Sequence, residues 1–283
     1  MSMNMDLRYT EMTPNGFGIT INVKNTLYHA QSEFQTIDIV DTDAFGRMLL
    51  LDGLMMTTEK DEFFYHEMIS HIPMNSHPEP KQVLVIGGGD GGTVREVLKH
   101  PSVERVVLCE IDGLVVDSCK EFLPSIAGKL DDPRVEMQIR DGVEYISQQK
   151  NQFDVILIDS TDPMGPGVGL FTEEFYKNVN EALKPGGIMA AQSESPFANQ
   201  KEIQLMYPLL RKAFPIVRTF SGPIPTYPSG YWCWAFCSNT VEPLAFIDEQ
   251  RAALIEQDAK LYNVDIHKGA FALPNFLKKL VEG

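Results

Sequence analysis

The part of this sequence that most constrains its fold is a run of glycines placed directly after an apolar segment. Val83-Leu84-Val85-Ile86 is continuously apolar, residues 87–92 are Gly-Gly-Gly-Asp-Gly-Gly, and a helical pattern starts at Thr93. A strand that is apolar at every position is buried on both faces, as in parallel sheets. Glycines at its end allow a tight turn and let a ligand approach the backbone where the helix begins. The segment therefore predicts a strand, a turn and a helix with a ligand held at the turn.

The same alternation of strand and helix patterns continues toward the C-terminus. Further apolar runs, with helical patterns between them, occupy residues 106–109, 135–139, 153–158 and 187–191. This alternation predicts an α/β protein whose core is a Rossmann-like, methyltransferase-type doubly wound sheet with right-handed crossovers. The aromatic run at 231–237 predicts one more strand, packed in the core, and residues 243–261 predict a helix.

The N-terminal part has a different pattern of polar and apolar residues. From about residue 7 to 58 the chain alternates polar and apolar residues, most clearly at 17–23 and 34–40, with turns at Phe45-Gly46 and Asp52-Gly53. Residues 59–75 follow a helical period, and two prolines then interrupt the chain at Pro78 and Pro80. We therefore predict a small antiparallel β-sheet domain at 1–75 and a Rossmann-like catalytic domain at 76–283.

Composition and charge exclude several partners. The chain of 283 residues carries a formal net charge of −15, which repels phosphate backbones and anionic lipid, so we predict no nucleic-acid and no membrane partner. No apolar segment is long enough to span a bilayer, and residues 1–6 have neither a basic region nor an apolar run, so we expect a cytoplasmic protein.

Cys233 and Cys237, on one face of a strand, would lie about 13 Å apart, so we expect reduced cysteines.

Acidic residues follow the predicted parallel strands one after another. Ligands of such sheets bind beyond the carboxyl ends of the strands, where Asp90, Glu110, Asp141 and Asp159 stand. An acid roughly 20 residues beyond the glycines can accept hydrogen bonds from both hydroxyls of a ribose, which is the place of Glu110. Asp141 can accept from an adenine amino group, so the series predicts an adenosine-containing ligand.

Three aspartates in the segments that follow the predicted strands indicate which kind of ligand reacts here. Asp90, Asp159 and Asp162 are predicted to converge on one crevice with no Lys or Arg beside them. Such a cluster is costly unless it binds cations or holds protons, and either metal ions or amines would satisfy it. Metal sites usually bring histidines and more acids, whereas the nearest histidine here is His66 in the preceding helix. We therefore favour amines and predict no metal.

Taken together, these motifs resemble those of the spermidine synthase family of aminopropyltransferases. They occur in the family's order and cover nearly the whole chain. The matching segments are Gln35 in Glu33-Phe34-Gln35, Leu51-Asp52-Gly53, residues 58–67, residues 87–92, Glu110-Ile111-Asp112, Asp141-Gly142, residues 159–163 with Gly165-Pro166, and Ile224-Pro225-Thr226-Tyr227.

The resemblance implies a reaction. The family transfers an aminopropyl group from decarboxylated S-adenosylmethionine to putrescine, which gives spermidine and methylthioadenosine. The donor is a co-substrate, and no cofactor is implied. By this resemblance Asp159 is the general base, and we expect a raised pKa for it in an acidic, partly closed pocket. The family commonly forms dimers through its N-terminal region, so a homodimer or homotetramer is implied.

The resemblance also implies roles for individual residues. Those expected to bind the donor or methylthioadenosine are Gln35, Asp90, Glu110, Asp141, Gly142 and Pro166. Those expected to bind the diamine are Tyr65, His66, Asp90, Asp159, Ser160, Thr161, Asp162 and Tyr227. The segment 161–170 is rich in glycine and proline and is expected to close over the donor.

Two alternatives remain at this point. A methyltransferase that acts on a small amine would have the same fold, although Asp90 argues against it. Asp90 would pair with the free amine of the decarboxylated donor and repel the carboxylate of S-adenosylmethionine. The second alternative is a non-catalytic binder of polyamines or nucleosides. The acceptor also stays open between putrescine, cadaverine, agmatine and spermidine.

Overall fold

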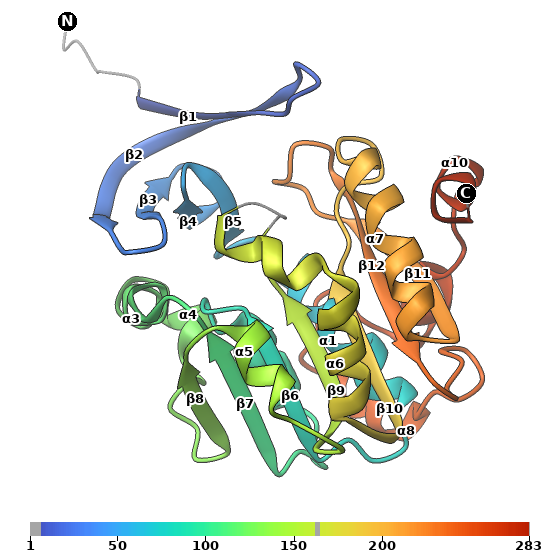
Figure 1. The fold of residues 1–283 in the computed structure, drawn as a ribbon. Helices are drawn as coiled ribbons and strands as arrows, with labels where there is room; N and C mark the ends of the chain where they lie inside the picture. The colour runs from blue at the N-terminus through green and yellow to red at the C-terminus, as the bar shows by residue number, and fades with distance from the viewer. Residues whose placement is uncertain (1–6, 162–164, 283) are drawn as a thin grey trace, which may run out of the picture.

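The computed structural model describes residues 7–161 and 165–282, which form two sheets (Figure 1). The first sheet is antiparallel, and its strands follow the chain in the order β1-β2-β3-β4-β5. The strands are β1 Leu7–Met12, β2 Gly18–Gln31, β3 Thr36–Thr42, β4 Gly46–Leu51 and β5 Leu54–Thr58. Its two faces pack differently, because Ile37 and Ile39 join the core of the second domain while Val40 and Met48 form a cluster of their own. The predicted small N-terminal antiparallel sheet is confirmed.

The second sheet has seven strands in the order β11-β12-β10-β9-β6-β7-β8. Its strands are β6 Gln82–Gly87, β7 Arg105–Glu110, β8 Val135–Ile139, β9 Phe153–Asp159, β10 Leu183–Gln192, β11 Ile216–Pro223 and β12 Tyr231–Ser238. Strands β6 to β10 pair in parallel, and β12 lies antiparallel between β10 and β11. From β6 the chain builds toward β8 on one side and then returns to β9 on the other. The order therefore reverses between β6 and β9, which is where such sheets bind ligands.

Helices cover both faces of this sheet, as the doubly wound pattern predicts. They are α2 Gly92–Val97, α3 Gly113–Phe122, α4 Pro124–Ala127, α5 Gly142–Ser147, α6 Glu173–Ala182 and α7 Gln200–Ala213, with the 3-10 helix η1 Gly165–Phe171 before α6. Leu84 and Ile86 of β6 pack with α5, α6 and α7, whereas Val83 and Val85 pack with α2, α3 and α4. Burial on both faces is the reason why β6 is apolar at successive positions.

Helix α1, Phe63–Ser76, connects the two sheets. The sequence prediction grouped this segment with the N-terminal domain, and the domain boundary at residue 75 stays a prediction. In the structure α1 packs on the second sheet, where Met68 and Ile72 contact a cluster that includes Phe220 and Trp234. The site residues that α1 carries are therefore positioned by the second sheet.

The C-terminal segment holds α1 near both of its ends. Glu67 accepts hydrogen bonds from the backbone N–H groups of Lys260, Leu261 and Tyr262, at 2.8, 2.8 and 2.7 Å. At the other end, Arg251 donates to the carbonyl oxygens of Met74 and His77, at 2.7 and 2.6 Å. These bonds satisfy carbonyl groups that a helix end leaves without partners.

The helix predicted at 243–261 is wrong in extent. Helix α8 covers only Glu249–Ile255, and α9 Val264–Ala270 and α10 Asn275–Glu282 follow it. Asp248 caps the start of α8 by accepting from the Arg251 N–H, and Glu67 takes the N–H groups of residues 260–262 that a longer helix would use. Strand β11 was not predicted, because only one part of it is buried and it has no continuous apolar run.

The remaining predictions at this level concern the cysteines and the membrane. Cys109, Cys119, Cys233 and Cys237 are buried free thiols, as expected. Among the helices of the described ranges, none combines the length and the apolar character that crossing a bilayer requires.

Candidate active site

A cavity of about 460 Å³ lies where the parallel strands end and the N-terminal sheet covers them. In Figure 1 the arrowheads of β7 and β9 point toward that sheet. The residues from the sequence prediction that line the cavity are Gln35, Tyr65, His66, Asp90, Glu110, Asp141, Gly142, Asp159, Ser160, Thr161 and Tyr227. Asp162 and the side chain of Pro166 lie outside the described part of the protein. Gly167 and Leu170 of the expected closing segment also line the cavity.

The glycine turn after β6 places one carboxylate at the cavity wall. Asp90 Oδ1 accepts a hydrogen bond from the Gly92 N–H at 2.8 Å, and its Oδ2 lies 3.4 Å from His66 Nε2. A Cβ on Gly92 would stand 2.2 Å from His66 Cε1, so a glycine is needed for the ring to lie against the turn. Gly87 has a φ of +77° and would meet the Asp159 carbonyl oxygen, which also requires glycine.

Asp159 ends strand β9 and faces neutral hydrogen-bond donors. Its Oδ2 accepts from Thr93 Oγ1 at 2.6 Å, and the Tyr65 hydroxyl also donates to this carboxylate. Burial raises the pKa of Asp159, and the negative charge of Asp90 raises it further. The expected direction of this shift is confirmed. Thr93 was not predicted as a site residue, although a hydroxyl in the first turn after the glycines was a usable signal.

Asp90 and His66 form a charged pair beside Asp159. Burial opposes ionisation of Asp90, but the charge and hydrogen bond of His66 outweigh it, so the pKa of Asp90 is lowered. Burial likewise disfavours a charged His66, yet Asp90 and Glu62 hold its pKa well above the ordinary value. Asp90 and Asp159 therefore differ, because the surroundings of Asp90 stabilise its ionised form whereas those of Asp159 disfavour its ionised form.

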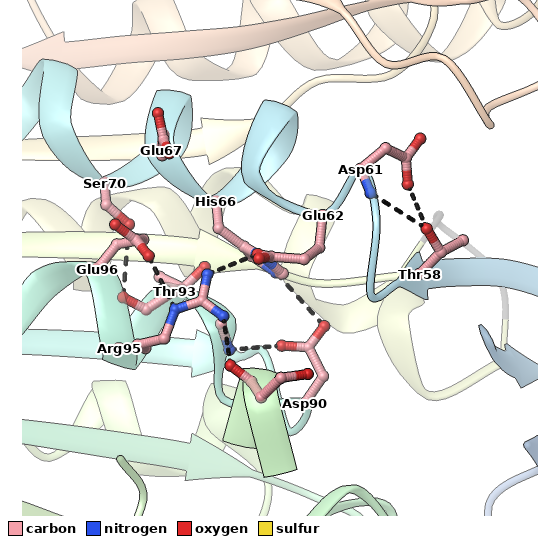
Figure 2. Close-up of polar contacts among 12 residues, drawn as sticks. Thr58, Asp61, Glu62, His66, Glu67, Ser70, Asp90, Thr93, Arg95 and Glu96 are labelled. Carbon is pink, nitrogen blue, oxygen red and sulfur yellow. Dashed lines mark hydrogen bonds and ion pairs between the residues drawn. The ribbon is translucent and has the colours of Figure 1, made fainter. Parts of the chain in front are cut away.

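Behind His66 a line of alternating charges leads away from the cavity (Figure 2). Glu62 Oε2 lies 2.6 Å from His66 Nδ1 and also accepts from Arg95 at 2.6 Å, and Arg95 Nε donates to Glu96 at 2.8 Å. As expected, no Lys or Arg is among the described residues that line the cavity, and Arg95 lies behind His66, from where its charge helps to lower the pKa of Asp90. Arg95 comes from α2, and the packing of α1 on α2 brings it to Glu62, which spacing along the chain does not reveal.

The donor side of the cavity is built around Glu110, at the end of β7. This buried carboxylate accepts from the backbone N–H groups of Gly89 and Asp112, at 3.2 and 2.9 Å. Burial raises the pKa of Glu110 to about 7. Gln35 reaches the same region from the N-terminal sheet, where its Nε2 donates to Asp112 Oδ2 at 3.0 Å and Ser32 donates to the same oxygen at 2.6 Å. The sequence did not predict that Ser32 and Asp112 position Gln35.

Asp141 stands at the same edge, next to the start of α5. It caps the helix, since its Oδ1 accepts from the Val143 N–H at 2.7 Å. Gly142 is the first helical residue and is buried against the cavity. These positions lie beyond the end of β8, as the order of strands and acids predicted.

Aromatic rings form the opposite wall. The Tyr65 and Tyr227 ring centroids are 6.4 Å apart, and Tyr227 lies 4.7 Å from Trp232 edge to face. The Tyr227 hydroxyl donates to the Met56 carbonyl at 2.9 Å, which holds the ring against the N-terminal sheet. The aromatic run was predicted to be core, and this is right for the fully buried Trp234, whereas Trp232 lines the cavity.

Asp61 ties this wall to the start of α1. Its Oδ1 accepts from Thr58 Oγ1 at 2.6 Å, and its Oδ2 accepts from the N–H and hydroxyl of Thr226, at 3.0 and 2.7 Å. The segment that carries Tyr227 is therefore fastened beside the segment that carries Tyr65 and His66.

Comparisons with known proteins agree with this geometry. Residues 62–248 match the family model described as spermine/spermidine synthase domain, and residues 8–59 match the one described as spermidine synthase tetramerisation domain. The chain is 49% identical over 277 residues to a polyamine aminopropyltransferase of Bacillus subtilis, covering 98% of this chain and 99% of that protein. A polyamine aminopropyltransferase of Bacillus mycoides is 49% identical over 278 residues, covering 98% and 100%.

Solved structures give the same result. A spermidine synthase in complex with the transition-state analogue AdoDATO superposes with a TM-score of 0.96 at 46% identity, covering 99% of this chain and 96% of that one. The spermidine synthase of Thermotoga maritima superposes with a TM-score of 0.94 at 45% identity, covering 99% and 95%. Because the two family models match residues 8–59 and 62–248 and these relatives cover nearly the whole chain at 45–49% identity, the chain belongs to the spermine/spermidine synthase family and is a polyamine aminopropyltransferase.

Proposed function

We propose that the enzyme transfers the aminopropyl group of decarboxylated S-adenosylmethionine to putrescine, giving spermidine and methylthioadenosine, with Asp159 as the general base. The observation that carries this proposal is the unequal pair of carboxylates at the point where the strand order reverses. Asp90 is stabilised as an anion by His66, whereas burial and Asp90 raise the pKa of Asp159. An ionised Asp90 is suited to bind an ammonium group that stays charged. Asp159, with its raised pKa, is suited to accept a proton and release it again.

The chemistry of the step requires such a base. Putrescine arrives protonated, and an ammonium nitrogen has no lone pair to attack with. Asp159 takes one proton from the attacking nitrogen, whose lone pair then forms a bond to the methylene carbon beside the donor sulfonium. The carbon–sulfur bond breaks as the carbon–nitrogen bond forms, and its electron pair stays on sulfur as a neutral thioether. No metal or redox cofactor takes part in this proposed step.

The remaining residues would position the two substrates. On the nucleoside side we assign Gln35, Glu110, Asp141, Gly142 and Pro166, with Asp90 on the donor amine. On the diamine side we assign Tyr65, His66, Asp90, Asp159, Ser160, Thr161, Asp162 and Tyr227. Holding nitrogen and carbon in line supplies several kcal/mol of the rate enhancement in reactions of this kind.

Glu110 makes the binding of methylthioadenosine dependent on pH. Its pKa of about 7 means that it is half protonated near neutral pH, while ribose hydroxyls bind best to the ionised carboxylate. Binding must then release a proton at lower pH, so affinity should rise by up to about fivefold from pH 6 to 7 and by about twofold more before it levels off near pH 8. Calorimetry in buffers of different ionisation enthalpy measures both the affinity and the number of protons released on binding. Glu110→Gln should bind more weakly at every pH and remove this dependence, whereas a pH-independent wild type would contradict the assignment.

Product analysis tests the function itself. The enzyme is incubated with either decarboxylated or ordinary S-adenosylmethionine and with putrescine, cadaverine, agmatine or spermidine, and the products are identified by mass spectrometry. We expect spermidine and methylthioadenosine from the decarboxylated donor and putrescine, with the other acceptors slower. A methylated amine from S-adenosylmethionine without aminopropyl transfer would favour a methyltransferase. Binding of both substrates without turnover would favour a non-catalytic binder.

We also propose that the chain assembles as a homodimer or homotetramer through the N-terminal sheet. The match of residues 8–59 to a tetramerisation domain supports this, as does the edge strand β1, on which Leu7 and Met12 are 43% and 57% exposed. A cytoplasmic location is part of the same proposal and is supported by the four buried free thiols.

A further inference from the structure

The two ring nitrogens of His66 both face carboxylates. Nδ1 lies 2.6 Å from Glu62 Oε2, and Nε2 lies 3.4 Å from Asp90 Oδ2. A neutral imidazole has one N–H and one lone pair, so it can donate to only one ionised carboxylate and would point its lone pair at the other. With both carboxylates ionised, this arrangement requires a ring that carries two N–H groups. The geometry therefore describes His66 as an imidazolium.

Glu62 is fixed as the anion behind this ring. It directly precedes α1, its side chain is only 6% exposed, and it does not line the cavity. Arg95 donates to the same Oε2 that faces His66, at 2.6 Å, and burial of Glu62 is outweighed by His66 and Arg95, so its pKa is lowered. Glu62 therefore lies between two cations and has no surplus proton to share with His66.

Within residues 7–161 and 165–282, no cation pairs directly with Asp159, although the charge of His66 acts on it from farther away. Thr93 and Tyr65 donate to it, and both are neutral hydroxyls. The imidazolium of His66 thus contacts one cavity carboxylate, Asp90, and not the other. Two carboxylates that share one crevice otherwise exchange a proton between them, and neither has a defined role.

We propose that Glu62, held by Arg95, is a positioning residue that keeps His66 as an imidazolium against Asp90, so that Asp90 stays ionised and Asp159 takes the proton. The assignment of base to Asp159 rests on the proposed function, whereas the charge of His66 does not. Glu62 touches neither substrate nor reacting atoms in this proposal, and it acts through the histidine.

The charged groups around His66 come from several elements and agree with this proposal. Glu62 lies at the start of α1, Asp90 in the glycine turn, Arg95 on α2 and Asp159 at the end of β9. The line of charges continues, since Glu96 accepts from Arg95 and also pairs with Lys99 at 2.6 Å and with His71 at 3.0 Å. Replacing Glu62 by a neutral residue would leave Arg95 opposite His66, and like charges in a buried site disfavour the imidazolium.

Histidine NMR without substrate tests the charge directly. In enzyme labelled with nitrogen-15 histidine, the His66 signals are identified by their loss in His66→Gln. We expect both ring nitrogens of the wild type to show imidazolium shifts at pH 7.5, and His66 in Glu62→Gln to be neutral there. Glu59→Gln is the matched control, since Glu59 contacts the Arg47 N–H and Ser125 instead.

The pH profile of turnover tests the consequence. Without the imidazolium, the cavity carboxylates lose their cation, so the acidic limb of kcat/KM in Glu62→Gln should move up by about one pH unit or more. Glu59→Gln should keep the wild-type limb. An unmoved limb in folded Glu62→Gln, or a neutral His66 in the wild type at pH 7.5, would overturn the proposal. The wild-type measurement needs no turnover, and it uses folded His66→Gln only to assign the signals, so its failure is distinct from a failure of the proposed function.

Discussion

Asp159→Asn is expected to lower kcat by about 10²- to 10⁴-fold, the range that general-base catalysis typically supplies. The asparagine has nearly the same shape and can still accept from the Thr93 hydroxyl, which lies 2.6 Å from the carboxylate. It cannot take a proton, so the attacking nitrogen stays an ammonium group at neutral pH. Single-turnover measurements with decarboxylated donor and putrescine give the chemical step, and calorimetry should show methylthioadenosine binding close to that of the wild type.

Two further measurements make this result specific. Asp154→Asn is a matched control on the same strand, because Asp154 lies at the other end of β9 and pairs with Lys184 at 3.0 Å. It should keep kcat near the wild-type value. The loss in Asp159→Asn should narrow toward pH 10, where a growing fraction of an ordinary amine is deprotonated without help. Wild-type turnover in Asp159→Asn at pH 7.5 would exclude Asp159 as the base.

Asp90→Asn is expected to reduce the preference for the decarboxylated donor over S-adenosylmethionine by about 30-fold or more. Removing one partner of a buried charge pair typically costs about 2–5 kcal/mol, and about 1.4 kcal/mol corresponds to tenfold in binding. The variant loses attraction for the donor ammonium and also loses repulsion of the carboxylate that only S-adenosylmethionine carries. Both changes move the ratio of affinities in the same direction.

The ratio of the two dissociation constants is the quantity to measure, by calorimetry with each donor. Asp141→Asn is a suitable comparison, since Asp141 stands on the proposed nucleoside side, beyond the end of β8, and should weaken both donors by a similar factor. An Asp90→Asn enzyme with the wild-type preference would show that charge at this position does not select the donor. The His66 imidazolium would then be the partner for which Asp90 is needed.

Much of the site was predictable because parallel strands place their carboxyl ends at one edge. Asp90, Glu110 and Asp159 each stand at the end of a strand that is visible as an apolar run, and Asp141 follows the alternating segment 135–139, so their order along the chain predicted their convergence. The alternating N-terminal segment was equally readable, since a period of two residues is a local property of a half-buried strand. Gln35 was placed by its resemblance to a family motif, and the structure adds that Asp112 and Ser32 position it.

Contacts between elements were not predictable in this way. Glu67 and Arg251 hold α1 against segments nearly two hundred residues away, which explains why the predicted C-terminal helix is shorter than its pattern suggested. Trp232 and Trp234 stand two residues apart in one strand, yet one lines the cavity and the other is fully buried. The packing of neighbouring elements decides such differences, and the residue pattern within one strand does not reveal that packing.

By itself, the sequence determined the strands, the glycine turn and the acids that meet at the sheet edge, because each depends on residues close together in the chain. Only the tertiary structure decided how the charges of that glycine turn are balanced. Packing of α1 on α2 brings Glu62 and Arg95 together and lays His66 against Asp90, while the donors to Asp159 in the described part of the protein are the hydroxyls of Thr93 and Tyr65. The sequence alone does not distinguish Asp90 from Asp159. The two differ because burial and neighbouring charge, which are properties of the folded chain, stabilise their ionised forms unequally.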